Sequence, residues 1–220
     1  IDGTPLAYRV IGEYQHEDYW RNYGKQKSSF ISPSLTWFGE RATVNVSYSH
    51  RNYSTPFDRG TIFDLNTGHA VNVDRKTRFD EPFNITDGYS DLAQLNAEYR
   101  LSDAWTARFD YSYSQDHYND DQARVMAYDS ATGNLTRRVD ATHGSTQKMH
   151  TTRADLQGNV VIGGFYNEML TGVAYENYDL LRTDMIRCKN VKGFNIYNPV
   201  YGTISPCNAV SASDSDKRIQ

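Results

Sequence analysis

The chain has no long run of apolar residues. Among its 220 residues the longest apolar stretches are short, such as Val160-Val161-Ile162. A helix that crosses a bilayer needs about 20 mostly apolar residues in a row, so no segment is expected to cross a membrane as a helix. Each strand of a membrane β-barrel shows lipid only its alternate residues, so the absence of such a run does not exclude a barrel.

The chain has no net positive charge and few cysteines. The formal net charge is −4, so the chain lacks the basic excess typical of nucleic-acid binders. Its two cysteines, Cys188 and Cys207, lie in one polar segment near the end. An even pair in a loop favours a disulfide in an oxidising compartment, and two free thiols are the alternative. Two cysteines without a CxxC pair supply half of a zinc site, so we expect no metal site.

Catalytic signatures are missing as well. The sequence contains no GxSxG elbow, no HExxH and no P-loop. Its six histidines are scattered, and His117 beside Asp116 lacks a third group that would orient a general base. We therefore predict that the protein is not an enzyme and has no catalytic residues.

Aromatic residues, in contrast, are abundant, at 13% of the chain with 17 tyrosines. Since disordered chains of such polarity are poor in aromatics, we expect a folded protein. Apolar and polar residues alternate strictly in several segments, and a period of two predicts strands with two different faces. The alternation predicts seven strands, near residues 6–16, 28–38, 41–51, 89–101, 104–116, 150–161 and 165–178.

The lengths of these strands and of their connections favour a membrane barrel. Transmembrane β-strands need about 9–11 residues, whereas ordinary strands mostly have about 5–6. Short turns such as Gly39-Glu40 and Ser102-Asp103 alternate with long connections, as in outer-membrane barrels, whose long loops lie outside the cell. Extracellular loops are therefore predicted at residues 17–27, 52–88, 117–149 and 179–216.

Aromatic rings lie near both ends of the predicted apolar face. Trp37, Tyr99 and Trp105 neighbour the short turns. The group toward the long loops consists of Tyr14, Tyr48, Tyr111, Tyr113 and Tyr175. Rings with a polar tip collect at membrane–water interfaces, so the pattern predicts two aromatic belts. The opposite face, with Arg100 and Asp110, would then line a hydrated lumen.

Four short segments carry a family resemblance when they are taken together and in order. They are Gly3-Thr4-Pro5-Leu6-Ala7-Tyr8-Arg9, Pro56-Phe57-Asp58-Arg59-Gly60, Leu170-Thr171-Gly172-Val173-Ala174-Tyr175 and Phe194-Asn195-Ile196-Tyr197-Asn198-Pro199-Val200-Tyr201-Gly202. With these motifs and its loop rhythm, the chain resembles the TonB-dependent receptors of the outer membrane, and among them the ferric-siderophore receptors. Ala174 departs from the family, in which an acidic residue is common there.

The resemblance implies the fold class: an all-β, transmembrane, antiparallel up-and-down β-barrel. Receptors of this kind have 22 strands and a plugged lumen, so residues 1–220 would be a fragment of about seven strands within one barrel domain. The chain shows no signal peptide, begins with what looks like a mid-protein turn at Ile1-Asp2, and has no closing element at its end. We therefore expect a longer protein, whose N-terminal plug domain lies outside this sequence.

The resemblance also implies a function in the outer membrane of a Gram-negative bacterium. The whole receptor would bind a ferric siderophore and transport it actively, energised by the TonB complex through the absent N-terminal region. No cofactor is expected, because iron arrives as part of the siderophore complex. Further implied partners are the lipid and lipopolysaccharide of the membrane, and phage or bacteriocins that hijack such receptors. Nucleic acid is not expected.

Candidate ligand contacts are the aromatic and arginine side chains near the bases of the long loops. Rings offer contact area and arginine offers directional donors, which suits compact, polar chelates. Packing of loop against loop is the alternative for each of them. The candidates are Tyr53, Arg59, Tyr118, Tyr128, Phe194, Tyr197 and Tyr201.

Two other functions stay open at this point. A passive porin shares the alternation and the belts but lacks the four motifs, and a plug-sized segment before Ile1 would exclude it. A soluble carbohydrate-binding β-protein is the third hypothesis, and it predicts a protein that stays monomeric without detergent. Neither alternative requires an enzyme.

Overall fold

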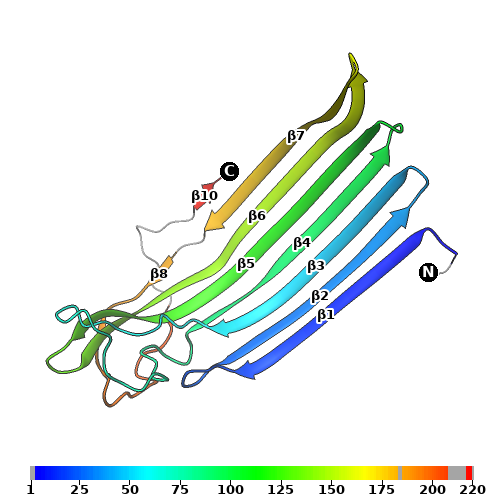
Figure 1. Cartoon of the computed structure of the whole chain (residues 1–220). Helices are drawn as coiled ribbons and strands as arrows, with labels where there is room; N and C mark the ends of the chain where they lie inside the picture. The colour runs from blue at the N-terminus through cyan, green and yellow to red at the C-terminus, as the bar shows by residue number, and fades with distance from the viewer. Residues whose placement is uncertain (1–2, 183–184, 208–216, 220) are drawn as a thin grey trace.

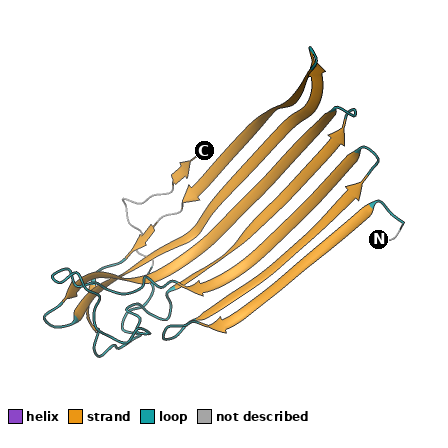
Figure 2. Cartoon of the chain, viewed as in Figure 1, coloured by secondary structure: helices purple, strands orange, loops and turns teal. Residues whose placement is uncertain are grey.

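The computed structural model describes residues 3–182, 185–207 and 217–219. Seven long antiparallel strands lie side by side in a single curved layer, in the order in which they follow one another along the chain (Figure 1). Short turns connect them at one end, and the long loops gather at the other (Figure 2). The predicted all-β, antiparallel up-and-down architecture is therefore confirmed. No helix that is long and apolar enough to span a bilayer occurs in the described ranges.

The long strands are longer than the alternation in the sequence indicates. Their bounds are β1 Leu6–Asp18, β2 Lys25–Phe38, β3 Ala42–Pro56, β4 Ile85–Arg100, β5 Trp105–Asp129, β6 Asn134–Ile162 and β7 Phe165–Arg182. Three short strands join them: β8 Met185–Arg187 and β9 Val191–Asn195 pair with β6, and β10 Lys217–Ile219 pairs with β7.

The register of the pairing keeps each face of the sheet uniform in character. Val46 of β3 lies opposite Leu35 of β2 and Leu95 of β4, and Leu95 lies opposite Tyr111 of β5. This row belongs to the apolar face. On the other face, here called the polar face, Glu98 lies opposite Arg108. A slip of one residue would exchange the two faces, so the alternation in the sequence specifies the register.

The short turns use residues that suit tight hairpins. Gly163 and Gly164 connect β6 to β7, with φ angles of 61° and 86°. Two consecutive residues with positive φ are characteristic of the type I′ turn, whose twist matches that of the flanking strands. At the β2–β3 turn the Gly39 amide donates to the Ala42 carbonyl across 2.7 Å.

The prediction of a loop over residues 117–149 is wrong. β5 and β6 continue as a paired hairpin up to Asp129 and Asn134, with register shifts near Tyr118 and Val125. The alternation is hard to see here because polar residues occupy both faces of the hairpin. With 29 residues and a rise of about 3.3 Å each, β6 is far longer than the bilayer crossing requires.

The other three predicted loops are shorter than expected. The loop predicted at residues 17–27 spans only residues 19–24, and the loop predicted at 52–88 spans only 57–84. In both cases the flanking strands continue further than predicted. The predicted loop 179–216 contains the end of β7 and the short strands β8 and β9. Residues 183–184 and 208–216 of that loop lie outside the described residues. In each case strand pairing satisfies backbone groups that a loop would leave to water.

The buried core lies at the long-loop end rather than within the sheet. One cluster is formed by Phe79, Leu135, Phe194 and Ile196, and a second by Ala123, Val139 and Ile204. The predicted disulfide is confirmed: it joins Cys188 to Cys207, whose Cα atoms are 6.4 Å apart, and both residues pack on the second cluster. The loops thus form a packed cap on the β5–β6 hairpin.

The disulfide is expected to protect the segment between its two cysteines. It closes a loop with a sequence separation of 19, and cross-links of this size contribute about 3 kcal/mol. We expect the double variant Cys188→Ser with Cys207→Ser to be cleaved within residues 189–206 faster than the wild type, in a protease time course on the complete protein. Reductant should bring the wild type to the rate of the variant. A wild-type rate that reductant leaves unchanged would contradict this role.

Candidate functional site

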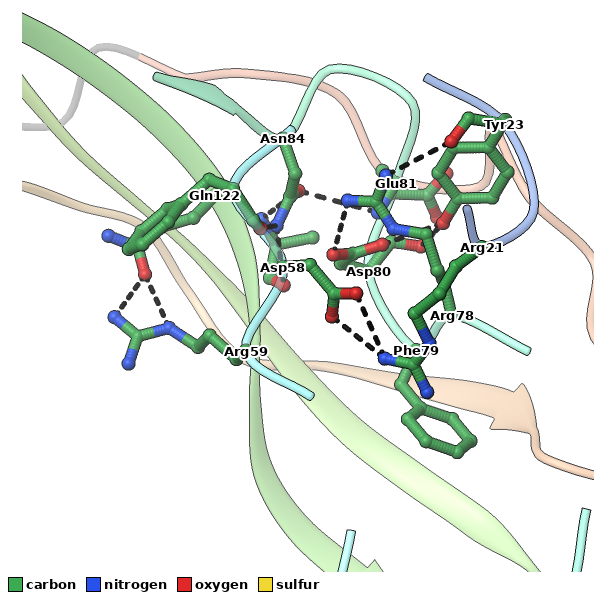
Figure 3. A network of polar contacts seen from close by, with 12 residues as sticks. Arg21, Tyr23, Asp58, Arg59, Arg78, Phe79, Asp80, Glu81, Asn84 and Gln122 are labelled. Carbon is green, nitrogen blue, oxygen red and sulfur yellow. Dashed lines mark hydrogen bonds and ion pairs between the residues drawn. The ribbon is translucent and has the colours of Figure 1, made fainter. Parts of the chain in front are cut away.

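A network of buried charged side chains fastens the loops to the strands (Figure 3). Its centre is the segment Arg78-Phe79-Asp80-Glu81, which precedes β4. Glu81 and Arg78 are among the largest fully buried side chains of the described residues. Charged groups are almost never fully buried unless they are paired, so this segment depends on partners from other elements.

Arg137 of β6 is the partner of Glu81. Their side chains are 2.7 Å apart and only 2% and 0% exposed, respectively. The second Glu81 oxygen accepts a hydrogen bond from the Gly202 amide at 2.6 Å. The Arg137 guanidinium also lies over the ring of Phe194, 4.0 Å from its centroid. One ion pair therefore joins β6, the 57–84 loop and the segment that carries the disulfide.

Tyr23, in the β1–β2 turn, contacts the same loop. Its backbone has a φ of 49°, a conformation that residues other than glycine seldom adopt. The Tyr23 hydroxyl donates to the Asp80 carboxylate across 2.7 Å, and Arg78 pairs with the same carboxylate at 2.7 Å. Burial raises the pKa of Asp80, although the hydrogen bonds from Arg78 and Tyr23 oppose that rise. Burial and the nearby Asp80 carboxylate raise the pKa of Tyr23.

A second ion pair links the β1–β2 turn to the start of the loop. Arg21 donates to both Asp58 oxygens, at 2.9 and 3.0 Å, and both side chains are buried. Burial alone would raise the pKa of Asp58, but the Gly60 amide and the Arg21 guanidinium lower it overall. Asp58 is thus held as a carboxylate, and both Arg21 and Tyr23 tie the β1–β2 turn to the loop.

Asn84 ends the loop by imitating a strand partner. Its side-chain oxygen accepts from the Ala123 amide at 2.6 Å, and its side-chain nitrogen donates to the Ala123 carbonyl at 3.4 Å. The same nitrogen donates to the Phe57 carbonyl at 3.3 Å. The side-chain amide of Asn84 therefore determines where β4 begins to pair with β5.

Below this cap, aromatic and polar side chains gather at the long-loop end of the polar face. Tyr53 and Tyr118 lie on either side of Gly88 in the register. A Cβ at Gly88 would clash with the backbone carbonyl of His117 and would also lie 3.0 Å from the Tyr53 hydroxyl, so the position requires glycine. Tyr178 of β7 donates to Gln147 at 3.3 Å. The polar-face patch consists of Phe30, Arg51, Tyr53, Asp116, Tyr118, Gln147 and Tyr178.

The patch offers rings and hydrogen-bonding groups on one surface. The Arg51 guanidinium lies over Phe30, 5.4 Å from the ring centroid. Gln147 donates to Asp116 at 3.2 Å. The side chains of Tyr118 and Tyr178 remain 36% and 37% exposed. Flat rings beside polar groups suit a compact polar ligand with some apolar surface.

The candidate residues named from the sequence fall into three groups. Tyr53 and Tyr118 come together in the polar-face patch. Phe194 and Tyr201 pack within the cap, with their ring centroids 5.5 Å apart, and the Tyr201 hydroxyl donates to the Arg78 carbonyl. These two rings support the loops, and a role in binding ligand stays a prediction for them.

The remaining three candidates contact different parts of the cap and of the β5–β6 hairpin. Tyr128 packs against the first core cluster. Tyr197 is 63% exposed, and its ring lies so close to Gly133 that a Cβ there would be 2.7 Å from it. Arg59 donates from Nε to the side-chain oxygen of Gln122 at 2.7 Å. Their contact with a ligand also stays a prediction.

Sequence reasoning missed Arg78, Glu81, Arg137 and Asn84. A charged or amide side chain in a polar stretch is usually solvated, so residue type alone marks none of these four as buried. A cluster of both charge signs beside Pro82 and two phenylalanines, Phe79 and Phe83, is the one signal that pointed to a packed segment.

Comparison with known proteins places this geometry in context. No family model matches the chain. A curated relative is the metal-pseudopaline receptor CntO of Pseudomonas aeruginosa, which is 27% identical over 206 residues. The alignment covers 91% of this chain and 28% of CntO. The chain thus spans little more than a quarter of the length of the curated relative that it matches.

Several solved receptors share the fold. The ferric-catecholate import receptor Fiu of E. coli K12 matches with a TM-score of 0.75 and 19% identity, over 98% of this chain and 36% of Fiu. BauA, the ferric preacinetobactin receptor of Acinetobacter baumannii, matches with a TM-score of 0.75 and 22% identity, over 94% and 31%. The ferripyoverdine receptor of the outer membrane of Pseudomonas aeruginosa gives 0.75 and 13%, over 94% and 29%.

These likenesses confirm the predicted resemblance to outer-membrane siderophore receptors and the fold of a barrel-wall segment. The named relatives and neighbours are receptors rather than enzymes, in keeping with the missing catalytic signatures. Within the described ranges, no group of three or more His, Cys, Asp or Glu side chains that could hold a metal ion occurs.

The Glu81–Arg137 pair is expected to hold the cap in place. Glu81→Gln removes the negative charge and leaves Arg137 buried without its counter-charge, and breaking such a pair costs about 3–5 kcal/mol. We expect faster protease cleavage within residues 57–84 of the complete protein. The matched control is Glu98→Gln, which breaks an Arg pair whose side chains are about half exposed and should cost less than about 1 kcal/mol. Equal cleavage of the two variants would contradict the assignment.

Proposed function

We propose that this chain is part of the wall of a Gram-negative outer-membrane receptor that binds a ferric siderophore or a related metal chelate outside the cell and takes it up. The proposal includes active transport energised by the TonB complex. The observation that carries it is the alignment with the metal-pseudopaline receptor across 91% of the chain. The metal is cargo held by the chelate, and no bond of the substrate needs to break.

The arrangement of the two faces supports the proposal. A continuous apolar face suits contact with lipid, while the polar face suits a hydrated lumen. The polar-face patch lies at the long-loop end, where a chelate that enters from outside meets the wall first. Tyr118 and Tyr178 offer ring surface there, and Arg51 offers charged donors.

The cap supports it too. The Glu81–Arg137 and Arg21–Asp58 pairs hold the 57–84 loop against β6 and the β1–β2 turn. A binding surface built on fixed elements loses less freedom when ligand binds. The wall is therefore suited to recognise a rigid chelate at low concentration.

Growth under metal limitation tests the transport function. We expect that deletion of the gene for the complete protein abolishes rescue by at least one purified chelate in a panel of hydroxamates, catecholates and carboxylates. The gene supplied on a plasmid should restore that rescue. Uptake of the radiolabelled metal complex should fall in parallel and should stop in a strain without TonB. If every chelate rescues the deletion strain as well as its parent, the proposal is wrong.

A pair of tyrosine variants tests the polar-face patch. Tyr118→Ala removes ring contact area, and we expect the affinity for the transported chelate to fall by roughly tenfold, a value typical of a buried aromatic anchor. Tyr175→Ala is the matched control, because this ring is 65% exposed on the apolar face. Titration of the purified complete protein, followed by tryptophan fluorescence, measures both. Similar affinities for the two variants would exclude Tyr118 as a contact.

A further inference from the structure

Three arginines converge above the polar-face patch. Arg124 of β5 and Arg138 of β6 are opposite one another in the register. Both contact Asp140, at 3.5 and 2.6 Å. Arg59 reaches the same area from the 57–84 loop, where it donates to Gln122 of β5. The pKa of Arg59 is lowered by burial and by the nearby Arg124 guanidinium, which agrees with this crowding of positive charge.

The acidic groups of this area are already occupied. Asp140 is buried and accepts two hydrogen bonds from Arg138, at 2.6 and 2.9 Å. Asp120 accepts from Gln122 and from the Thr142 amide, and burial raises its pKa. Asp121 contacts His143 at 3.1 Å. Among the described residues no carboxylate lies within ion-pair distance of Arg59, whose guanidinium is bonded to a neutral amide.

A hollow of about 300 Å³ opens beside Arg59 and Arg124. Two further carboxylates line it, those of Asp58 and Asp80. Each is already paired, with Arg21 and Arg78 respectively. The side chain of Arg124 is 42% exposed and makes one long contact with Asp140. Because both carboxylates are already paired, the charged groups left to bind a ligand in the hollow are the guanidiniums of Arg59 and Arg124.

We infer that Arg59 and Arg124 form an anion-binding site at the mouth of the receptor, with Arg138 beside them engaged by Asp140, and that the transported chelate carries a net negative charge. Guanidinium forks match carboxylate or catecholate oxygens in geometry, and they keep their charge at any physiological pH. An anionic chelate would be attracted to this site and would then meet the rings of Tyr118 and Tyr178 below it. This inference rests on the proposed function and names the substrate class of the same receptor.

The charge of the transported chelate is the first test. Growth rescue in the deletion and complemented strains is scored for anionic chelates (ferric citrate and ferric enterobactin), a neutral one (ferrichrome) and a cationic one (ferrioxamine B). We expect receptor-dependent rescue by anionic chelates alone. Receptor-dependent rescue by ferrichrome or ferrioxamine B would overturn the inference and leave the transport function standing. Receptor dependence for no chelate would remove the transport function and this inference together.

Arginine variants are the second test and locate the site. The double variant Arg59→Gln with Arg124→Gln keeps Arg138 and Asp140, and thus the buried ion pair. We expect its affinity for the transported anionic chelate to fall roughly tenfold or more, because each lost charge-assisted hydrogen bond is worth about that factor. The loss should shrink as salt screens the charges. Arg59→Lys with Arg124→Lys should recover part of the affinity by restoring the charge without the fork.

Arg153→Gln is the matched control. Arg153 also lies on the polar face, with its side chain 54% exposed, but it pairs with Asp155 at 2.7 Å, far along β6 from the loop cap. It should bind the chelate like the wild type. Protease cleavage within residues 57–84 checks that the cap stays intact in every variant. An intact double variant with wild-type affinity, or a control that loses as much as the double variant, would overturn the assignment of the site.

Discussion

The pairing of the seven long strands in one continuous register is the constraint on which the rest of the structure depends. In a bilayer no water is available to satisfy backbone groups, so each strand must bond to its neighbours along its whole crossing. From β1 to β7 the pairing between adjacent strands is antiparallel and sequential. Because side chains alternate, this register also decides that Val46, Leu95 and Tyr111 share a face while Glu98 and Arg108 share the other.

At the long-loop end of the sheet, the cap provides packing partners for the strands. β5 and β6 extend beyond what a bilayer crossing requires, and their upper parts need partners other than lipid. The 57–84 loop and the disulfide segment provide them, through small apolar clusters and through buried ion pairs. Burying a pair such as Glu81–Arg137 gives little net stability compared with an apolar contact. The pair favours one position of the loop, because moving the loop would separate the two charges and leave Arg137 buried without its counter-charge.

Much of the fold was predictable from the sequence, and the reason is the period of two. Segments such as Ala93 to Leu101 have one apolar and one polar face, so their alternation is visible without a structure. The upper β5–β6 hairpin was not predictable in this way. Gln122, Arg137 and Asp140 are polar residues that become buried only because loops cover them, and local sequence carries no sign of such cover.

The candidate site, too, was predictable from local sequence only in part. Tyr53 and Tyr118 were predicted as ligand contacts because they lie near the base of a long loop, and the structure places them on either side of Gly88 on the polar face. Phe194 and Tyr201 match that description equally well, yet they pack within the cap. The sequence shows how close a residue lies to the long-loop end of its strand. Whether its ring faces a ligand or a neighbouring loop depends on long-range pairs such as Arg137 with Glu81.

The left-handed conformation of Tyr23 has a consequence for how the molecule assembles. A non-glycine residue at a φ of 49° is held there at a cost of order 1 kcal/mol or more, and its bonds to Asp80 and Arg78 form only once the 57–84 loop has docked. The contacts that hold the β1–β2 turn in this shape therefore depend on the 57–84 loop, and the loop in turn depends on Arg137 of β6. The first hairpin is in this way coupled to a strand far along the chain.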